Sequence, residues 1–427
     1  MKKVLMVALD FPPCQSAGVQ RTLYFKKYLE RNEWLPLVLT AKPLIYDKLN
    51  VEQLSDDAFF GPTVFRAFGL NALKHLSFKG KHFEFTTFPD RFSTWRWDGV
   101  RLGKKILASE LPELLWTTFP CSTSMRIGLQ LKKASGLPWV ADFRDPFSGT
   151  NPYVRARNPI GKGIDEEVVR LADKLIFTTQ NAADVYLTEY PFLDKSKIEI
   201  IANGYDESVF SDIKLQEDTQ HTAVDVSEFT VLHSGFLYPG GRDIESLIEA
   251  LRELRNASFA GANRLKIIFR GGELSSKMAL RIKQYGLEKN VVFLPTIPFA
   301  ESIKEMQSVD ALLVLQGEIF NNQIPGKIYE YVRSKRPIIA LTHEDGATAK
   351  LCQDVPHAHI ADMNDPLSIK LALQNLLESK VDQAFDPALY SRDIGAKKLL
   401  HVLDSLMLTS VSKPGMVNQS IDKDRVR

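Results

Sequence analysis

The sequence predicts an α/β protein with two doubly wound parallel-sheet domains. Short apolar runs alternate with amphipathic helical stretches along most of the 427 residues. Each run is apolar throughout rather than alternating between apolar and polar residues, which is typical of strands buried on both faces of a parallel sheet. The series runs twice, and a polar stretch without periodicity, 211–228, separates the two halves. Repeated strand–helix units of this kind form right-handed parallel sheets covered by helices on both faces.

Each apolar run is an expected strand. In the first half the runs are Val4–Leu9, Pro36–Thr40, Leu114–Thr117, Trp139–Ala141, Leu175–Thr179 and Ile198–Ile201. In the second half they are Thr230–Ser234, Leu265–Arg270, Val291–Leu294, Ala311–Leu315, Ile338–Leu341 and His359–Ala361. Between them, apolar residues at 244, 247, 248 and 251 form one stripe of a helix. Asp365 followed by Pro366 begins another helix, because it combines a capping side chain with proline at the first helical position.

These elements divide the chain into an N-terminal domain over 1–210 and a C-terminal domain over 229–390. The stretch 391–408 has the pattern of a further helix. Residues 409–427 are polar and without helical pattern, so a frayed tail is expected there. In doubly wound sheets ligands bind at the carboxyl ends of the strands, which predicts a binding site in the cleft between two facing sheets.

Charge and composition exclude some classes of protein. Lys and Arg number 54 against 52 Asp and Glu, a net charge of +2 that argues against a whole-chain nucleic-acid binder. The three cysteines are far apart and form no disulfide framework, which favours a reducing compartment. The apolar run Val4–Leu9 is too short for a signal peptide or a membrane span. We therefore expect a cytoplasmic protein.

One stretch, Phe59–Lys105, departs from the pattern. It holds nine Phe and two Trp, with nine Lys or Arg against three Asp or Glu. Interleaved aromatic and basic residues suit the inner membrane surface or a lipid-linked anionic partner. The alternatives are an irregular insertion whose aromatic residues pack on the sheet, and a stacking surface for nucleic acid.

The most informative segment is 322–336 (NQIPGKIYEYVRSKR), where a loop that follows a strand becomes a helix. Pro325 and Gly326 stand at that transition, and the N–H groups and dipole of a helix start favour a phosphate. Lys327 adds a positive charge in the first turn. Glu330, one turn further on, could accept two hydrogen bonds from a ribose diol. The alternative is an ordinary ion pair between Lys327 and Glu330 on the surface of the helix.

A second segment, 233–242 (HSGFLYPGGR), leads from a strand to a helix through a glycine-rich loop. Gly235, Gly240 and Gly241 let the backbone approach a ligand closely. Arg242 is placed to bind a diphosphate with two parallel hydrogen bonds. A flexible loop with a solvated arginine is the alternative interpretation.

Two further segments lie in the N-terminal half. Asp142, Arg144 and Asp145 directly follow an apolar strand, at the end of a sheet where ligand sites form. An ion pair of Arg144 with either aspartate would be the structural alternative. Residues 10–21 (DFPPCQSAGVQR) run from a strand through a Pro/Gly turn into a helix, where Gly18 could receive a phosphate.

Together these four segments resemble the retaining, nucleotide-sugar-dependent glycosyltransferases of family 4, which have two Rossmann-like domains (the GT-B fold). The resemblance runs from about Lys3 to Leu408 and is closest to the branch that builds bacterial capsule, O-antigen and exopolysaccharide. The matching phrases are LPWVADFRDP at 137–146, IANGYD at 201–206, GFLY at 235–238 and PGKIYEY at 325–331. The helix expected at 391–408 matches one that returns to the N-terminal domain in this family.

The resemblance implies transfer of a hexose-like sugar from a nucleotide diphosphate sugar to a glycan or lipid-linked acceptor, without a metal or other cofactor. Glu330 would hold the ribose, and Arg242 and Lys327 the diphosphate. The implied donor-binding residues are Gly18, Gly235, Arg242, Asn322, Pro325, Gly326, Lys327 and Glu330. The implied catalytic residues are Arg144, Asp145 and Arg242, with Asp142 on the acceptor side. The departing diphosphate would act as the base, so positive groups around it would supply much of the catalysis.

The chain departs from the family pattern in three places. Asn322 stands where the family often has a first glutamate, seven residues before the second. No lysine follows Arg242 before Lys266, and Arg144-Asp145 stand where many relatives have histidine. Two alternatives follow: a nucleotide-sugar epimerase on the same fold, with acid–base groups sought at His233 or His343, and a non-catalytic nucleotide-sugar-binding homologue.

Overall fold

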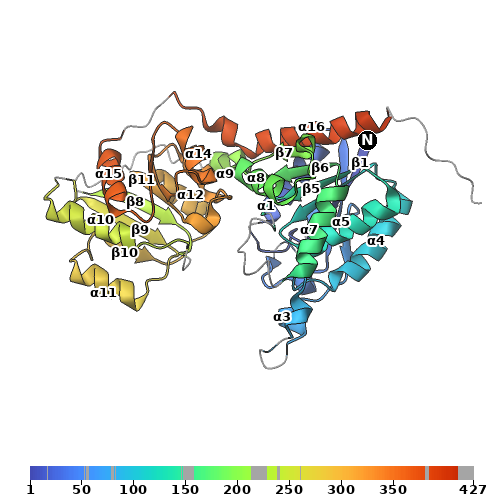
Figure 1. The fold of residues 1–427 in the computed structure, drawn as a ribbon, viewed down its shortest axis with the longest axis horizontal. Coiled ribbons are helices and arrows are strands. Elements are labelled where there is room, and N and C mark those ends of the chain that lie inside the picture. Colours follow the sequence, from blue (N-terminus) through green and yellow to red (C-terminus); the bar gives the residue numbers. More distant parts are fainter. Residues whose placement is uncertain are drawn as a thin grey trace, which may run out of the picture. The chain divides into compact units, whose positions relative to one another are not determined.

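A computed structural model describes most of the chain, in which two parallel sheets are each flanked by helices (Figure 1). The described residues are 1–16, 18–51, 53, 57–77, 81, 83–145, 147, 158–212, 228–237, 241–259, 261–379 and 384–411. The expected fold class, α/β with two doubly wound domains, is confirmed. The expected linker and tail lie for the most part outside the described residues.

The first sheet has seven strands in the order β3-β2-β1-β4-β5-β6-β7. Its strands are β1 (Lys2–Val7), β2 (Trp34–Ala41), β3 (Val64–Ala67), β4 (Leu114–Phe119), β5 (Trp139–Phe143), β6 (Lys174–Phe177) and β7 (Ile198–Ile200). The longer helices that connect them are α1 (Val19–Glu30), α4 (Trp95–Glu110), α5 (Ser122–Ser135), α7 (Pro159–Leu171) and α8 (Gln180–Glu189). Shorter helices are η1 (Pro43–Ile45), α2 (Asp57–Phe60), α3 (Ala72–His75), η3 (Glu84–Thr87), η5 (Lys195–Lys197) and α9 (Glu207–Asp212).

The second sheet has six strands in the order β10-β9-β8-β11-β12-β13, which repeats the order of β1 to β6 in the first sheet. Its strands are β8 (Phe229–Ser234), β9 (Leu265–Arg270), β10 (Val291–Leu294), β11 (Ala311–Gln316), β12 (Ile338–Thr342) and β13 (Ala358–Ala361). Its helices are α10 (Glu245–Asn256), α11 (Ser276–Gln284), α12 (Phe299–Ser308), η6 (Glu318–Phe320), α13 (Lys327–Ser334), α14 (Ala347–Gln353), α15 (Pro366–Leu377) and η7 (Pro387–Tyr390). The last helix of the chain is α16 (Arg392–Val411).

The second sheet is buried on both faces, as its continuous apolar runs predict. In β11, Leu313 and Leu315 pack in the core beneath α10 and α15, whereas Leu312 and Val314 pack in the core beneath α12 and α13. Successive side chains of a strand point to opposite faces, so one apolar run serves two hydrophobic cores. Asp365 caps α15 by accepting a hydrogen bond from the Leu367 N–H, with Pro366 at the first position, as expected.

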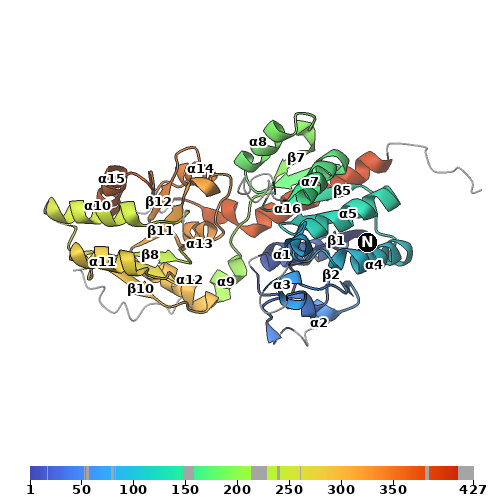
Figure 2. The same cartoon turned by 60° about the horizontal axis from the view of Figure 1, so that its bottom comes forward.

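By backbone contacts the chain forms two compact units, seen again in the turned view of Figure 2. The first takes the described residues of Met1–Asp142, Asn158–Leu175 and Ala396–Arg427, and the second those of Phe143–Arg157 and Ile176–Gly395. Within the first unit, α16 lies beside the starts of β1 and β2. The Lys2 ammonium pairs with Asp404 at 2.7 Å, and the Trp34 indole N–H donates to the same carboxylate at 3.2 Å.

One interpretation of the stretch 59–105 was an irregular insertion, but the stretch contains more regular secondary structure than that interpretation implies. It supplies β3, which pairs in parallel with β2, and most of α4. Periodicity misses β3 because only four residues pair and most of the strand is partly exposed. Phe59 and Trp95 are buried, whereas Phe83, Phe85 and Trp97 are each more than 70% exposed. The aromatic residues therefore divide between the core and the surface.

Among the described residues, no helix is both long enough and apolar enough to span a bilayer.

Within the second unit, Gly204 lets two distant segments approach closely. The Arg392 guanidinium donates to the Gly204 carbonyl at 2.8 Å, and the backbone of Tyr205 exchanges hydrogen bonds with Tyr390 and Arg392. A Cβ on Gly204 would lie 2.7–2.8 Å from backbone atoms of 390–392. Only glycine fits without a shift of the backbone.

We therefore predict that Gly204→Ala destabilises the protein by about 1–3 kcal/mol, the usual cost of overpacking. Differential scanning calorimetry measures the effect as a lowered melting temperature. Gly163→Ala is the matched control, because a Cβ there meets nothing within 4 Å and alanine is the better helix former. Equal melting temperatures for the two variants would contradict the close approach.

Candidate functional site: a charged cluster at the carboxyl end of β8

Gly235 brings the end of β8 next to the start of α13. It follows the last residue of β8 and has a φ of +138°, a region that side chains rarely adopt. A Cβ at this position would lie 2.5 Å from the Lys327 Nζ atom. The lysine side chain therefore lies across the glycine, at the sheet edge where doubly wound folds bind ligands.

His233 and Tyr331 fix this contact. The fully buried His233 ring has its Nδ1 atom 3.0 Å from the Leu313 carbonyl oxygen and its Nε2 atom 3.4 Å from Lys327 Nζ. The Tyr331 hydroxyl accepts a hydrogen bond of 2.9 Å from the Ser234 N–H. Both side chains of α13, Lys327 and Tyr331, are thus held against the last two residues of β8 and the glycine that follows.

The cluster contains charges that are poorly solvated. Burial and, to a smaller extent, the positive charge of Arg242 lower the pKa of Lys327 to about 7, while Glu330 opposes the shift. Burial raises the pKa of Glu330, which is 7% exposed, to about 7 against the attraction of Arg392 and Lys327. The pKa of His233 lies well below its ordinary value because of burial and the neighbouring Lys327. Lys327 and Arg242 are thus two basic side chains close together. An added anion would stabilise the charged form of Lys327.

Arg242 lies close enough to Lys327 for its charge to lower the pKa of the lysine. Its Nη1 atom donates to the Phe236 carbonyl at 3.4 Å, and its guanidinium lies 5.6 Å from the centre of the Phe320 ring. The neighbouring Gly241 accepts a hydrogen bond of 2.8 Å from the Gly317 N–H. A Cβ on Gly241 would lie 2.4 Å from Phe320, so glycine is required for the loop to pack there. Gly240 lies outside the described residues.

Pro325 and Gly326 precede α13, as predicted. Gly326 is its N-cap residue and forms no side-chain cap, and a Cβ there would meet nothing within 4 Å. The helix start is therefore open to a ligand. Among the described residues no ion pair joins Lys327 to Glu330, and Lys327 contacts His233 instead.

Asn322 has a different environment. Its carbonyl accepts a hydrogen bond of 2.7 Å from the Thr179 hydroxyl, also within the second unit. It contributes to an open groove of about 610 Å³. The groove is lined by Asn181, Asp184, Val185, Thr188, Glu189, Asn322, Asp345 and Lys350. Asn322 is thus held in place through its backbone carbonyl, and this contact does not involve its side chain.

The predicted residues of the first half fall into three settings. Asp142 is fully buried and accepts two hydrogen bonds of 2.8 Å from Arg21 and one of 3.2 Å from the Thr118 hydroxyl. Arg144 and Asp145 form the ion pair that was the structural alternative for this segment, at 3.6 Å. Gly18 is the N-cap residue of α1, and its N–H donates to the Ser16 hydroxyl at 3.0 Å.

The structure brings together Gly235, Arg242, Pro325, Gly326, Lys327 and Glu330 within the second unit. Gly18 and Asp142 belong to the first unit, which the structure describes separately. Sequence reasoning missed the part of His233 in the cluster and the partnership of Arg21 with Asp142. The signal for His233 was its place two residues before the glycine, at the end of a buried strand. Arg21 offered none beyond its charge on a helix.

Within the described residues, no group of three or more His, Cys, Asp or Glu side chains is placed to hold a metal ion. His357 and His359, a spaced pair in the sequence, lie next to and within β13. The His357 ring packs edge-on against Phe385, with the ring centres 5.3 Å apart.

Solved structures share this arrangement along nearly their whole length. Sucrose-phosphate synthase from Thermosynechococcus elongatus is 15% identical with a TM-score of 0.59, over 96% of this chain and 100% of that one. HepE from Anabaena, solved in complex with UDP, is 15% identical with a TM-score of 0.61, over 95% and 100%. UDP-GlcNAc 2-epimerase from Methanocaldococcus jannaschii is 12% identical with a TM-score of 0.53, over 95% and 100%.

The chain therefore has the GT-B fold, which glycosyltransferases and nucleotide-sugar epimerases share. No protein-family model matches the sequence, and no curated protein matches it either. At these identities the likeness establishes the fold, and the activity has to be argued from the residues of this chain.

The Arg21–Asp142 pair gives a stability prediction. Both side chains are almost fully buried, so Arg21→Met leaves a buried carboxylate without its partner and destabilises the protein by about 3–5 kcal/mol. Urea unfolding followed by circular dichroism measures the loss. Arg101→Met is the control, because Arg101 pairs with Asp98 on the surface and such pairs contribute about 0–1 kcal/mol. Equal midpoints for the two variants would show that Asp142 does not depend on Arg21.

Proposed function

We propose that this protein is a glycosyltransferase that moves a sugar from a nucleotide diphosphate sugar to a glycan or lipid-linked acceptor in the synthesis of a surface polysaccharide. The observation that carries the proposal is the cluster of Lys327, Arg242 and Glu330 at the open N-terminus of α13. Lys327 and Arg242 would bind the diphosphate, together with backbone N–H groups at the helix start. Glu330 would accept hydrogen bonds from the ribose hydroxyls.

The chemistry follows from where charge develops. As the bond between sugar and phosphate breaks, negative charge grows on the diphosphate, and Lys327 and Arg242 stabilise it. The departing phosphate oxygen would take the proton of the acceptor hydroxyl on the same face, which gives retention of configuration. This route uses no metal. Arg144 and Asp145, at the carboxyl end of β5, are the proposed contacts of the acceptor hydroxyl, with Gly18 and Asn322 as further contacts of the donor.

A nucleotide-sugar epimerase is the principal alternative, because epimerases share the fold. It would need a side chain beside the sugar ring that is free to transfer a proton. The His233 ring contacts the Leu313 carbonyl and Lys327 through its two nitrogens, and His343 accepts a hydrogen bond from the Asp345 N–H. These engagements favour transfer over epimerisation.

Nucleotide-sugar binding tests the proposal. We expect at least one of UDP-, GDP- and dTDP-glucose to bind, as measured by isothermal titration calorimetry. Glu330→Ala should weaken that binding by about 10–100-fold, since hydrogen bonds to a charged group contribute about 1.5–3 kcal/mol. Glu301→Ala, an exposed carboxylate in the first turn of α12, is the control.

If no nucleotide sugar binds at millimolar concentration and Glu330→Ala changes nothing, the proposal is wrong. If the bound donor yields a free epimerised sugar without an acceptor, the epimerase is the correct assignment. Binding without turnover across many acceptors would indicate a non-catalytic homologue.

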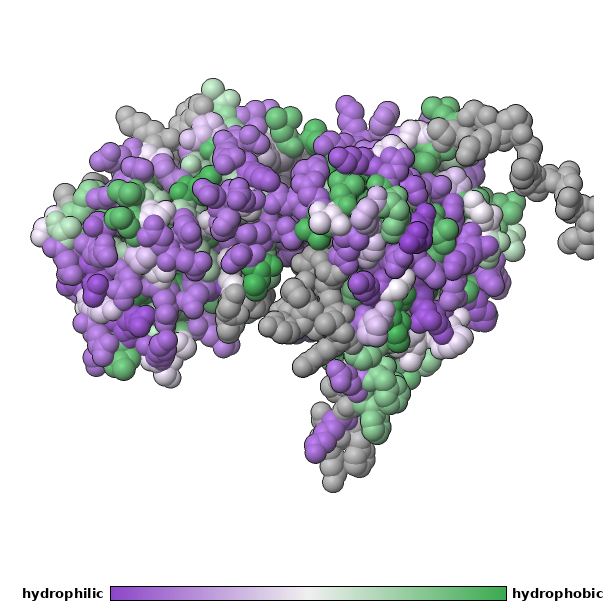
Figure 3. All heavy atoms as spheres, viewed as in Figure 1, coloured by the Kyte–Doolittle hydropathy of each residue, from purple (hydrophilic) through white to green (hydrophobic). Residues whose placement is uncertain are grey.

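We also propose that a projecting part of the first unit contacts the inner membrane surface, where a lipid-linked acceptor would lie. In Figure 1, α3 stands out at the lower end of this unit, and Figure 3 shows apolar residues in green on the surface there. The Phe83 and Phe85 rings stack at 5.6 Å, and both are 71% exposed. Leu73 of the neighbouring α3 and Leu76, which follows that helix, are also exposed, and Lys74 and Lys81 supply positive charge.

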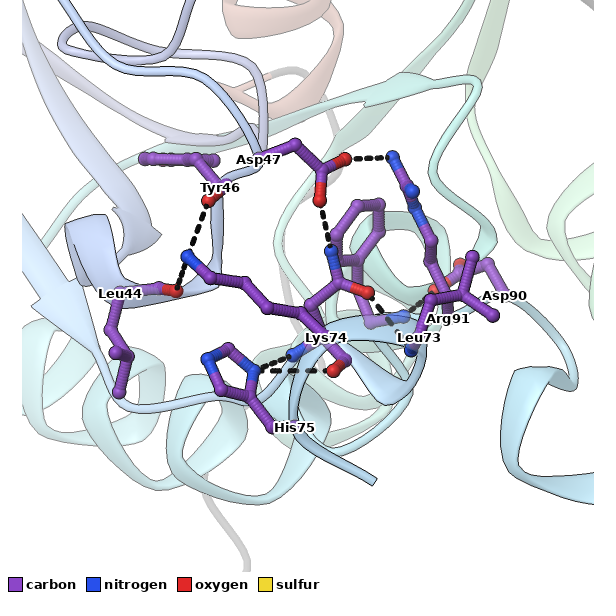
Figure 4. A network of polar contacts seen from close by, with 10 residues as sticks. Leu44, Tyr46, Asp47, Leu73, Lys74, His75, Asp90 and Arg91 are labelled. Carbon is purple, nitrogen blue, oxygen red and sulfur yellow. Dashed lines mark hydrogen bonds and ion pairs between the residues drawn. The ribbon is translucent and has the colours of Figure 1, made fainter. Parts of the chain in front are cut away.

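A polar network anchors this projection (Figure 4). Asp47 accepts a hydrogen bond of 2.8 Å from the Asn71 amide and pairs with Arg91 at 2.7 Å. The Lys74 ammonium donates to the Tyr46 carbonyl at 3.2 Å, and Asn71 caps α3 by accepting from the Leu73 N–H. These contacts fix the part of the chain that carries the exposed apolar side chains, and such an arrangement suits their insertion at a lipid interface.

Vesicle sedimentation tests this surface. Replacing both Phe83 and Phe85 with Ser should weaken binding to phosphatidylglycerol vesicles at low salt by at least tenfold, because each buried phenyl ring contributes about 1.5–3 kcal/mol. Phe299→Ser is the control, since Phe299 is also exposed and lies in the second unit. A wild-type protein that stays in solution with these vesicles would contradict the proposal.

A further inference from the structure

Lys327 and Glu330 are separated by one helical turn, yet the lysine contacts a buried imidazole rather than the carboxylate. Residues spaced i, i+3 are neighbours on a helix, so an ion pair was available to them. Instead Lys327 extends across Gly235 toward β8, and Glu330 is buried with Ile328 and Tyr329 in the first turns of α13. The two opposite charges of the site are thus held apart.

His233 determines where the lysine points. Its Nδ1 atom lies against a carbonyl oxygen, which can only accept, so Nδ1 carries the proton and Nε2 presents a lone pair. That lone pair faces Lys327 Nζ at 3.4 Å. Burial and the neighbouring Lys327 keep the pKa of His233 well below its ordinary value, so the ring stays neutral. His233 is therefore a positioning residue, because it acts on a ligand only through Lys327.

The surrounding charges make the cluster responsive to an anion. Arg242, from the loop before α10, repels the Lys327 ammonium, and Arg392, from the start of α16, attracts the Glu330 carboxylate. The elements packed beside α13 contribute Tyr390 from η7 and Glu305 from α12, and Glu305 pairs with Arg270. Burial dominates both groups and brings the pKa of Lys327 and that of Glu330 to about 7.

We propose that Lys327 and Glu330 form a proton-exchange couple, positioned by His233, whose two charges are completed when a nucleotide diphosphate sugar binds. The diphosphate stabilises the ammonium form of Lys327, and the ribose hydroxyls stabilise the carboxylate form of Glu330. One proton leaves the carboxyl group and one is gained by the amine, so near neutral pH the exchange balances. The inference rests on the proposed donor site and adds its regulation by pH.

The sign of the net proton change then depends on pH. Above pH 7 the free lysine is mostly neutral and the free glutamate mostly ionised, so binding takes up protons. Below pH 7 the reverse holds, and binding releases protons. With both pKa values near 7 in the free protein, the net change is about +0.8 proton at pH 8 and about −0.8 at pH 6. Affinity is then greatest near pH 7 and about threefold weaker one unit to either side.

Titration calorimetry in buffers of different ionisation enthalpy measures this change directly. The probe is whichever of UDP-, GDP- or dTDP-glucose binds most tightly, because its esterified diphosphate does not titrate between pH 6 and 8. We expect wild-type binding to change from proton release to proton uptake across pH 7. Glu330→Gln should leave only uptake, and Lys327→Met only release.

Two substitutions separate the positioning role of His233 from a structural one. In His233→Asn the side-chain amide can still donate to Leu313, but the acceptor facing Lys327 is lost. The alkaline limb of the affinity profile should then move to lower pH, because the ammonium loses a hydrogen-bond acceptor. In His233→Gln the amide oxygen can take the place of Nε2 and should restore the limb. Lys304→Met, an exposed lysine of α12, is the control and should match the wild type.

Donor binding whose net proton change keeps one sign from pH 6 to pH 8 would overturn the proton-exchange couple and leave the proposed function intact. A profile that Lys327→Met leaves unchanged would overturn it as well. Failure of every nucleotide sugar to bind at any pH would instead contradict the proposed function itself.

Discussion

The passage of Lys327 across Gly235 is the contact on which the candidate site depends. It requires a glycine at positive φ directly after β8, a buried imidazole two residues earlier, and a helix that starts with lysine. The contact places a partly buried amine beside Arg242, and the resulting repulsion is relieved by a negatively charged ligand. The proposed anion-binding site would therefore be a consequence of how α13 packs on the sheet.

The remainder of the fold supports that packing. Apart from β7, the two parallel sheets have the same strand order. Each sheet collects the carboxyl ends of its strands at one edge, where loops rather than core residues meet a ligand. In the second unit the start of α16 is tied to Gly204 and Tyr205, and Arg333 of α13 pairs with Glu207 at 2.6 Å. The Arg333–Glu207 pair holds α13, and the contacts of Gly204 and Tyr205 with Arg392 keep that arginine close enough to attract Glu330.

Sequence patterns predicted the fold well, whereas they did not encode which side chains of the candidate site contact one another. Continuous apolar runs located every strand of the described residues except β3, whose short, partly exposed residues lack that pattern. Glycines and charges at the ends of strands and at helix starts indicated Gly235, Arg242 and Lys327, which the structure places near one another. The pairing of Arg21 with Asp142, and the contact of His233 with Lys327, join residues 121 and 94 positions apart. No local spacing encodes such contacts, because they arise only when strands and helices pack.

The most direct test of the central claim is a crystal structure with a bound nucleotide diphosphate sugar. The account predicts the diphosphate within hydrogen-bond distance of Lys327 and Arg242 at the start of α13, with the ribose hydroxyls on Glu330. It also predicts that Lys327 stays near His233: the distance between Lys327 Nζ and His233 Nε2, 3.4 Å in the free protein, should change by less than the length of one hydrogen bond. A nucleotide bound elsewhere, with Lys327 and Glu330 free of it, would contradict the account.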